Sequence, residues 1–217
     1  MTKKCQLFIF EGVDMTGKST VSRHVSEQLS LKYPGRVSYY RAPGGTENAE
    51  KIRDAARTMN LKPFNQGLLF LTALSDLRDQ IAQDIKDGKT IILDRWLWST
   101  LAYQVSMATS REALHLRSII EEIHYPFNTC FYLSVTPEVL EERIASITRP
   151  EIKDRFESST PEYRKKILDS YEEMFSQGHR LPGGIRTLET VVIDTVANDI
   201  ESVKTIALGR VLEAVTK

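Results

Sequence analysis

The sequence predicts an α/β fold in which a five-stranded parallel sheet is covered by helices on both faces. Short apolar runs rich in β-branched and aromatic residues recur along the chain, and segments with the 3.6-residue apolar spacing of a helix lie between them. Such regular alternation is typical of a parallel sheet whose connections are helical. Ligands of these sheets bind at the carboxyl ends of the strands, so functional residues are expected there.

The predicted strands and helices follow one another in order. Five segments have the composition of buried strands, namely residues 5–10, 37–40, 90–93, 129–135 and 191–193. After the first of them, Val21, Val25 and Leu29 have helical spacing. The longest predicted helix spans residues 64–87 and ends at Gly88, which can adopt the left-handed conformation of a C-cap.

A surface loop and the start of the last helix are predicted late in the chain. The stretch 148–161 breaks the alternation with two prolines, mixed charge and few apolar residues, and it is predicted to be a mobile surface loop. Asn198 followed by Glu201 resembles a capping box, so the last helix is predicted to begin with Asn198 as its cap.

Size and composition limit the possible classes of protein. The 217 residues are 41% hydrophobic, which suffices for one well-cored domain, so a single domain over residues 1–217 is expected. The net charge is zero, unlike the basic surface of a nucleic-acid-binding protein. The apolar run at residues 7–10 is too short for a signal peptide or a membrane span, so we expect a cytoplasmic protein without membrane contact. Cys5 and Cys130 lie far apart in strand-like segments and indicate neither a disulfide nor a metal site.

Residues 12–19 form the strongest motif of the chain. They satisfy G-x-x-x-x-G-K-[ST] between a predicted strand and a predicted helix, which is the context of a phosphate-binding loop, and they predict a three-layer P-loop NTPase fold. In such a loop backbone N–H groups bind phosphate oxygens, Lys18 reaches the β- and γ-phosphates, and Ser19 offers its hydroxyl to Mg²⁺. The residues expected to bind ATP here are Gly12, Val13, Asp14, Met15, Thr16, Gly17, Lys18, Ser19 and Thr20.

Further segments narrow the function beyond nucleotide binding. They are Glu11-Gly12, Arg41 to Thr46, Leu68 to Phe70, Asp94-Arg95 and Ser99 to Gln104. In order and spacing these segments resemble the thymidylate kinase family, and residues 154–157 and 193–194 extend the resemblance over roughly the whole chain. The resemblance implies transfer of the γ-phosphoryl group of ATP to dTMP, giving dTDP and ADP. It also implies Mg²⁺ as cofactor and a homodimer as the assembly.

The resemblance assigns roles to charged residues near the strand ends. Arg41 and Arg95 match arginines that hold the acceptor phosphate, and two guanidiniums suit a dianion, although a lone arginine after a strand is more often a solvated charge. Asp94 closes a strand, where a carboxylate can order Mg²⁺ through water, and Asp14 matches a position near the acceptor sugar and phosphate. A general base is not required, because a phosphate monoester with a second pKa of about 6 is largely deprotonated at neutral pH.

The resemblance also places side chains around the acceptor base and sugar. Phe70 is expected to stack on the base, although a phenylalanine at such a position is more often part of the core. Tyr103 is expected to pack against the deoxyribose and leave no room for a 2′-hydroxyl. Gln104 offers a donor and an acceptor to a pyrimidine edge, and Ser99 of the same motif is assigned to the same site.

The chain departs from the family four residues after Phe70, where an arginine that reads a thymine carbonyl is replaced by Leu74. Arg78 lies one helical turn further along the same face, about 6 Å away. It is expected either to fold back to the base or to be a solvated residue. We therefore expect dTMP to remain the best acceptor, with weaker discrimination against other deoxynucleotides.

Arginines around residues 148–161, the predicted lid, are candidates for the remaining positive charge. Met15 stands where some family members have an arginine in the phosphate loop, and members without one supply the catalytic arginine from a lid. Arg149 and Arg155 are the candidates here, and Arg143 is expected to bind ATP. Closure of the lid would bring positive charge to the transferred group and exclude water. A solvated charged loop is the alternative.

Three other functions fit part of the sequence. A deoxynucleoside monophosphate kinase of broader specificity would keep every motif. A deoxynucleoside kinase needs no arginines for an acceptor phosphate, so Arg41 and Arg95 disfavour it. A nucleotide-binding switch protein would share the phosphate loop, but the chain has no N-K-x-D segment to read guanine.

Overall fold

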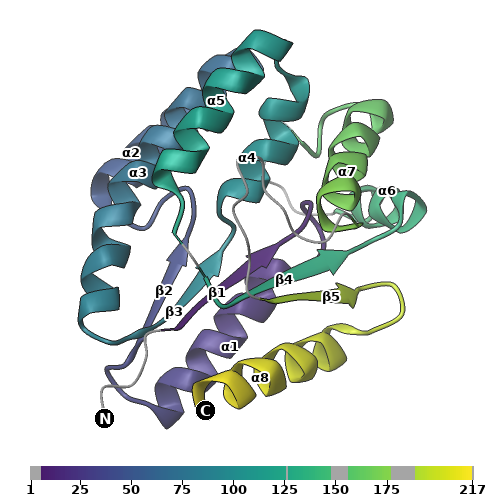
Figure 1. Cartoon of the computed structure of the whole chain (residues 1–217). Coiled ribbons are helices and arrows are strands. Elements are labelled where there is room, and N and C mark those ends of the chain that lie inside the picture. The colour runs from purple at the N-terminus through teal and green to yellow at the C-terminus, as the bar shows by residue number, and fades with distance from the viewer. Residues whose placement is uncertain (1–5, 126, 148–155, 177–188, 217) are drawn as a thin grey trace.

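The computed structural model describes residues 6–125, 127–147, 156–176 and 189–216, and it confirms the predicted α/β fold (Figure 1). All five predicted strands form one parallel sheet in the order β2-β3-β1-β4-β5. The elements are β1 (Gln6–Glu11), α1 (Lys18–Lys32), β2 (Val37–Arg41), α2 (Glu47–Thr58), α3 (Pro63–Lys86), β3 (Thr90–Asp94), α4 (Leu97–Tyr103), the 3-10 turn η1 (Val105–Met107), α5 (Ser110–Ile123), β4 (Thr129–Ser134), α6 (Pro137–Ala145), α7 (Pro161–Ser176), β5 (Glu189–Asp194) and α8 (Ile200–Thr216).

The register of the sheet brings charged residues to one edge. Phe10 of the central strand β1 is the partner of Asp94 in β3, and Arg41 of β2 is the partner of the same residue. On the other side of β1, Glu11 is opposite Tyr132 of β4. Because the strands are parallel, their carboxyl ends lie together, and the charged residues that close them share this edge of the sheet.

Helices cover both faces of the sheet and divide the core into two clusters. Phe8 and Phe10 of β1 pack with residues of α1 and α8, which lie below the sheet in Figure 1. Leu7 and Ile9 face the opposite way, toward α3, α4, α5 and α7. Successive side chains of a strand point to opposite faces, so a strand covered on both sides is apolar throughout. This is why the strands were recognisable as continuous apolar runs.

One of the predicted helix ends is confirmed, and another differs in the structure. The long predicted helix is confirmed as α3, and Gly88 follows it with a φ of 66°. The predicted cap of α8 was wrong by one residue, because Asp199 Oδ1 accepts from Ser202 N at 2.8 Å. Asn198 instead donates its amide to the carbonyl of Asp194 at 2.9 Å. A carboxylate at this helix start is favoured by the helix dipole.

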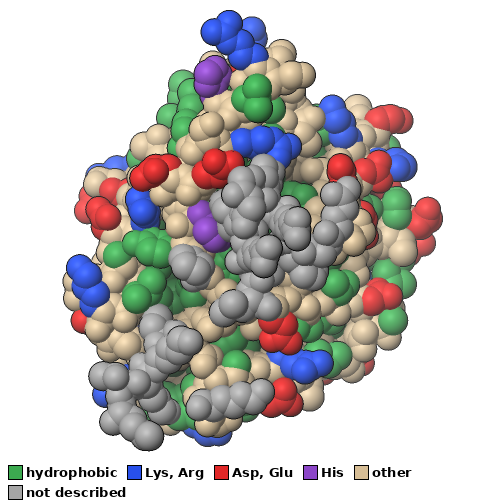
Figure 2. Space-filling model, in the orientation of Figure 1, with side chains coloured by type: hydrophobic (Ala, Val, Ile, Leu, Met, Phe, Trp, Pro, Cys, Tyr) green, Lys and Arg blue, Asp and Glu red, His purple; other side chains and the backbone are tan. Residues whose placement is uncertain are grey.

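The described surface carries charges of both signs. Figure 2 shows Lys and Arg side chains interspersed with Asp and Glu on one face, in keeping with the net charge of zero. None of the helices in the described ranges is both long enough and apolar enough to cross a membrane. Cys130 is a buried free thiol in β4, as expected of a packing residue. Cys5 and residues 148–155 of the predicted lid lie outside the described residues.

Candidate active site

The phosphate loop joins β1 to α1 at the carboxyl edge of the sheet. Gly12 has a φ of 145°, and a Cβ on it would lie 2.6 Å from the carbonyl oxygen of Leu133, so the loop excludes a side chain there. Gly17 has a φ of 81° and turns the chain into α1. The first turn of a helix has free N–H groups that bind anions, and this loop presents such a turn at the end of the central strand.

Lys18 is buried within the loop to which it belongs. Its ammonium donates to the carbonyl oxygen of Val13 at 2.9 Å and lies 3.5 Å from Asp14 Oδ1. The hydroxyl of Thr16 donates to the same carbonyl at 3.0 Å. Burial lowers the pKa of Lys18, and the nearby positive charge of Arg95 lowers it further. The negative charge of Asp14 raises it but does not offset these two effects. Lys18, which is predicted to reach the phosphates, therefore lies across the loop and is bound to its backbone.

Arg95, Asp14 and Tyr103 form a connected cluster beside the loop. Arg95 Nη2 donates to Asp14 Oδ1, and Arg95 Nη1 donates to Gly12 O at 3.1 Å. The hydroxyl of Tyr103 donates to Asp14 Oδ2 at 2.8 Å and accepts from Asp14 N at 3.1 Å. The Arg95 guanidinium also lies 5.6 Å from the centre of the Tyr103 ring. The structure thus brings together three residues predicted for the acceptor site.

The charges of this cluster support one another. Loss of hydration disfavours the ionised form of Asp14, but Arg95 and Lys18 outweigh it and hold the pKa of this carboxyl well below its usual range. Burial works against the charge of Arg95, yet Asp14 raises the pKa of Arg95 well above its ordinary value. Burial and Asp14 together raise the pKa of Tyr103 well above that of a free tyrosine. The Tyr103 hydroxyl therefore stays protonated and able to donate at neutral pH.

Asp94 closes β3 with a carboxylate that is 1% exposed, and neither of its oxygens has a hydrogen-bond partner among the described residues. Buried carboxylates are ordinarily paired or hydrogen-bonded, because an unpartnered charge is costly. Ser19 is exposed in the first turn of α1. A hard cation such as Mg²⁺ prefers oxygen ligands of these kinds. The described ranges contain no group of three or more His, Cys, Asp and Glu that could hold a metal ion.

Arg143 of α6 links the phosphate loop to the end of β5. Its Nη1 donates to Met15 O at 3.1 Å and to Thr195 Oγ1 at 3.0 Å, and its Nη2 donates to Thr195 O at 2.7 Å. Met15 has a φ of 68°, a conformation uncommon for a residue with a side chain. The arginine predicted to bind ATP is therefore fixed against the loop. Thr20, also predicted to bind ATP, is exposed in α1.

A second group of arginines lies near the end of β2, and only Arg41 among them was predicted from the sequence. Arg41 is exposed at the carboxyl end of the strand. Arg53 of α2 has a 13% exposed side chain, and its Nη1 donates to Glu50 Oε2 at 3.4 Å. Burial lowers the pKa of Arg53, and Arg41 and Arg57 lower it further. Clustered guanidiniums of this kind attract an anion. Arg53 was missed because an arginine within a helix resembles a solvated charge.

Gln104 and Ser99 lie close to the Arg95 cluster. Gln104 is 4% exposed, and its Nε2 donates to Gln66 Oε1 at 3.1 Å. Ser99 accepts from Arg95 Nη1 at 2.9 Å through its hydroxyl oxygen. Phe70 of α3, predicted to stack on the base, is half-buried. Two of these three predicted residues are thus joined to buried hydrogen-bond networks.

Leu74 and Arg78 are not brought to this site. Leu74 is fully buried in the core between α3 and the sheet, so it offers no surface to a ligand. Arg78 lies over the ring of Tyr125, with its guanidinium carbon 5.3 Å from the ring centre. Its guanidinium is thus directed toward the segment after α5, and a role at the base stays a prediction.

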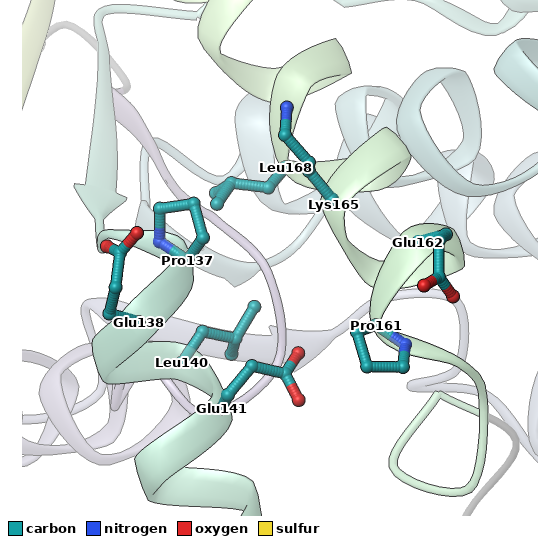
Figure 3. Close-up of a pocket in the computed structure, with 8 residues that line it drawn as sticks. All are labelled: Pro137, Glu138, Leu140, Glu141, Pro161, Glu162, Lys165 and Leu168. Atoms are coloured by element: carbon teal, nitrogen blue, oxygen red, sulfur yellow. The ribbon is translucent and has the colours of Figure 1, made fainter.

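The cavity drawn in Figure 3 is separate from these residues. It lies between α6 and α7, measures about 300 Å³, and is lined by Pro137, Glu138, Leu140, Glu141, Pro161, Glu162, Lys165 and Leu168. None of the predicted site residues lines it. Arg149 and Arg155, the predicted catalytic arginines of the lid, lie outside the described residues. Phe156, the first described residue after them, packs on Tyr103 with ring centres 5.5 Å apart.

Comparison with known proteins decides the family. Residues 10–181 match the family model of thymidylate kinase. The chain belongs to the thymidylate kinase family. It is 32% identical to the thymidylate kinase of Wolbachia pipientis subsp. Culex pipiens (strain wPip), over 76% of this chain and 78% of that protein. It is also 32% identical to the thymidylate kinase of Chlorobium limicola (strain DSM 245 / NBRC 103803 / 6330), over 80% and 84%.

A solved structure extends the likeness to the fold. The crystal structure of thymidylate kinase from Ehrlichia chaffeensis superposes with a TM-score of 0.71 at 20% identity, covering 96% of this chain and 98% of that one. The match to the thymidylate kinase family includes the phosphate loop, Arg95 and α7. As a member of this family the chain is a kinase, an enzyme that transfers a phosphoryl group from ATP. The alternative of a nucleotide switch protein is therefore set aside.

Proposed function

We propose that this thymidylate kinase family member transfers the γ-phosphoryl group of ATP to dTMP and releases dTDP and ADP. The observation that carries the proposal is the direct contact between the two halves of the site. Arg95 and Tyr103, from the acceptor side, both bind the carboxylate of Asp14 in the phosphate loop. An acceptor phosphate held at Arg95 would therefore lie beside the loop that holds the donor, as direct transfer requires.

The donor would be held by the phosphate loop and its surroundings. The N–H groups of the first turn of α1 and the ammonium of Lys18 would bind the β- and γ-phosphates. Lys18 would exchange its contact with the carbonyl of Val13 for a phosphate oxygen. Arg143, already fixed to the loop through Met15, would support the nucleotide from the side of α6.

Ser19 and Asp94 are the residues that would hold Mg²⁺. Their support is the exposed hydroxyl in the first turn of α1 and the buried carboxylate that lacks hydrogen bonds within the described residues. When bound, the ion neutralises charge on the phosphate oxygens. Asp94, held by β3, would order its water ligands.

The acceptor phosphate would be bound by Arg95 and Arg41, with Arg53 as a third guanidinium close to Arg41. Arginine pairs with phosphate oxygens in a bidentate manner, so this group would both neutralise and orient the dianion. Because the phosphate attacks without a general base, the protein contributes positioning and charge neutralisation. Arg149 and Arg155 remain the candidates for a catalytic arginine from the lid.

A deoxynucleoside monophosphate kinase of broader specificity is the second candidate. It is favoured by the positions of Leu74, which is buried in the core, and Arg78, which lies over Tyr125. Recognition of the base would then depend on stacking at Phe70 and on the amide of Gln104.

The assembly and its cellular location are proposed on the family resemblance alone. We propose a homodimer that works in the cytoplasm. Sedimentation equilibrium would test the assembly, with an expected mass of about twice the 24.7 kDa of one chain. A concentration-independent mass of one chain would contradict it.

The test of the proposed function is an acceptor screen in which ADP release from ATP is measured with each nucleoside monophosphate and with thymidine. We expect the highest kcat/KM for dTMP and no turnover of thymidine, which lacks the phosphate that the arginines bind. A preference for another monophosphate would overturn the thymidylate assignment and leave the kinase assignment in place. Turnover of thymidine with none of dTMP would overturn the acceptor-phosphate role of Arg95.

A further inference from the structure

Glu11 is a fully buried carboxylate at the end of β1 that the proposed function does not use. Its Oε1 accepts from Trp96 N at 2.7 Å and from Ser99 N at 3.3 Å. Its Oε2 accepts from the hydroxyl of Ser99 at 2.8 Å and from that of Tyr171 at 3.0 Å. Four donors thus converge on one side chain, and three of them belong to the segment that follows Arg95.

The contacts of Glu11 fix the backbone at Arg95. Arg95 has a φ of 72°, in the left-handed region that residues with a side chain seldom adopt. Its N–H donates to Phe10 O at 2.9 Å, and the N–H of Trp96 donates to Glu11. Two consecutive residues of β1 therefore hold the two sides of this turn. Conformations of this kind persist only where neighbouring contacts impose them.

The contacts of Glu11 also fix the guanidinium of Arg95. The Ser99 hydroxyl donates a hydrogen bond to Glu11. The oxygen of the same hydroxyl is therefore available to accept from Arg95 Nη1 at 2.9 Å. A carboxylate only accepts hydrogen bonds, so it sets the direction of this chain of hydrogen bonds. If the Ser99 hydroxyl pointed toward Arg95 instead, its proton would face the N–H of Arg95 Nη1, and this hydrogen bond would be lost.

We propose that Glu11 is a positioning residue for Arg95, which it holds beside the phosphate loop before the acceptor arrives. The inference rests on the proposed role of Arg95 at the acceptor phosphate. A glutamine at this position would present N–H donors where hydroxyl protons now point, so the amide is a poor substitute despite its equal size. Preorganisation of this kind lowers the cost of ordering a binding group when its ligand arrives.

The first test compares Glu11→Gln with wild type by steady-state kinetics with dTMP and ATP. We expect the KM for dTMP to rise about tenfold or more, while the KM for ATP changes less than about twofold. Tyr171→Phe is the control, because it removes a hydrogen bond to the same carboxylate and a 2.9 Å contact with the Ser99 hydroxyl, while Ser99 keeps its bonds to Glu11 and Arg95. Its KM for dTMP should stay within about twofold of wild type. Equal effects of the two substitutions, or equal shifts of both KM values in Glu11→Gln, would overturn the proposal.

The second test is a double-mutant cycle, whose result a merely structural role would not produce. If Glu11 acts through Arg95, then Glu11→Gln should not change the KM for dTMP further in an Arg95→Ala background. If the fold-changes in the KM for dTMP of the two single variants multiply in the double variant, the proposal is overturned.

If Glu11→Gln does not fold, Ser99→Ala takes its place in the cycle, because it removes the link to Arg95 and keeps Glu11. An unchanged KM for dTMP in Ser99→Ala would refute the link. An unchanged KM in Arg95→Ala alone would instead refute the proposed function of Arg95.

Discussion

Arg95 is ion-paired with Asp14 across the junction of β3 and the phosphate loop. The guanidinium hydrogen bonds of Arg95 within the described residues go from Nη1 to Gly12 and Ser99 and from Nη2 to Asp14. A guanidinium has five N–H donors, so two remain for a ligand. A bound phosphate could therefore be held by Arg95 while the pair with Asp14 persists. This arrangement would place the acceptor phosphate against the loop that binds the donor.

The first prediction concerns Arg95. Arg95→Ala should raise the KM for dTMP and lower kcat, with the KM for ATP little changed, because the side chain is proposed to bind the acceptor phosphate. Loss of charge-assisted hydrogen bonds corresponds to about 1.5–3 kcal/mol, or about ten- to a hundredfold in kcat/KM. Steady-state kinetics with each substrate varied in turn checks this, with Arg78→Ala as a control arginine on α3. A collapse of ATP affinity in Arg95→Ala would move this residue to the donor site.

The second prediction concerns Lys18. Lys18→Ala should abolish measurable turnover without unfolding the protein, because it removes the charge proposed to neutralise the β- and γ-phosphates. Lys165→Ala, which removes an exposed lysine on α7, should keep full activity. Turnover and the thermal midpoint are measured for both variants. Activity of Lys18→Ala close to wild type would refute the role of the lysine.

The sheet and the phosphate loop could be predicted from the sequence because their signals are local. A strand covered on both faces is a continuous apolar run, and the loop has fixed spacing between Gly12 and Ser19. The cluster of Asp14, Arg95 and Tyr103 was predicted only as separate members of one site. Their mutual hydrogen bonds depend on how α4 packs beside the loop, which no local pattern specifies.

Other parts of the site could not be predicted, for physical reasons that differ. Arg53 acquires its place because α2 packs on α3, within electrostatic reach of Arg41, and nothing in its own neighbourhood in the sequence marks this arrangement. Leu74 lies on the buried face of α3, and the rotation of a helix about its axis is fixed only by tertiary packing. Glu11 was noted only as part of a motif, because the donors that surround it come from α4 and α7.

The third prediction concerns Asp94. Asp94→Asn should lower kcat about a hundredfold or more, because the carboxylate is proposed to order Mg²⁺. The thermal midpoint should stay unchanged or rise, since the carboxylate of Asp94 has no hydrogen-bond partner within the described residues and an amide carries no buried charge. Calorimetry and activity at varied Mg²⁺ check both parts.

Asp84→Asn is the matched control for this prediction. Asp84 is equally buried, but it accepts from Tyr40 at 2.6 Å and from Lys89 at 2.8 Å. Its substitution should cost about 1–3 kcal/mol of stability and leave kcat unchanged. If Asp94→Asn destabilises the protein as much as Asp84→Asn does, Asp94 has a structural role instead.

The fourth prediction concerns selection of the base. Arg78→Ala should leave the order of preference among dTMP, dUMP and dCMP unchanged, because Arg78 lies over Tyr125. It should cost only about 1–2 kcal/mol of stability, the usual size of a partly buried cation–π contact. The measurement is kcat/KM for the three acceptors and urea unfolding of both proteins. A changed order of preference would show that Arg78 reaches the base.

The fifth prediction concerns pH. Burial lowers the pKa of His124 from 6.5 to about 4. The unfolded chain therefore binds a proton at a higher pH than the folded chain does, so the free energy of unfolding is highest above about pH 6.5 and falls as the pH drops toward about 4. The full shift corresponds to ~3 kcal/mol, which we reduce to about 1–2 because the imidazole is partly exposed to water.

The measurement for His124 is urea unfolding at about pH 7.5 and about pH 5, a range that covers more than half of the effect. Wild type should lose about 1 kcal/mol more than His124→Asn between these two conditions. Equal losses in the two proteins would show that another group causes the pH dependence.

The proposed reaction is transfer of the γ-phosphoryl group to dTMP in a site shared by the phosphate loop and Arg95. It is tested by incubating the enzyme with Mg²⁺, dTMP and ATP labelled in its γ-phosphate, and by separating the labelled products. Transfer to dTMP predicts label in the β-phosphate of dTDP, in amounts equal to the ADP formed, and little of it in inorganic phosphate. Labelled inorganic phosphate that forms equally fast without dTMP, with no labelled dTDP, would contradict it.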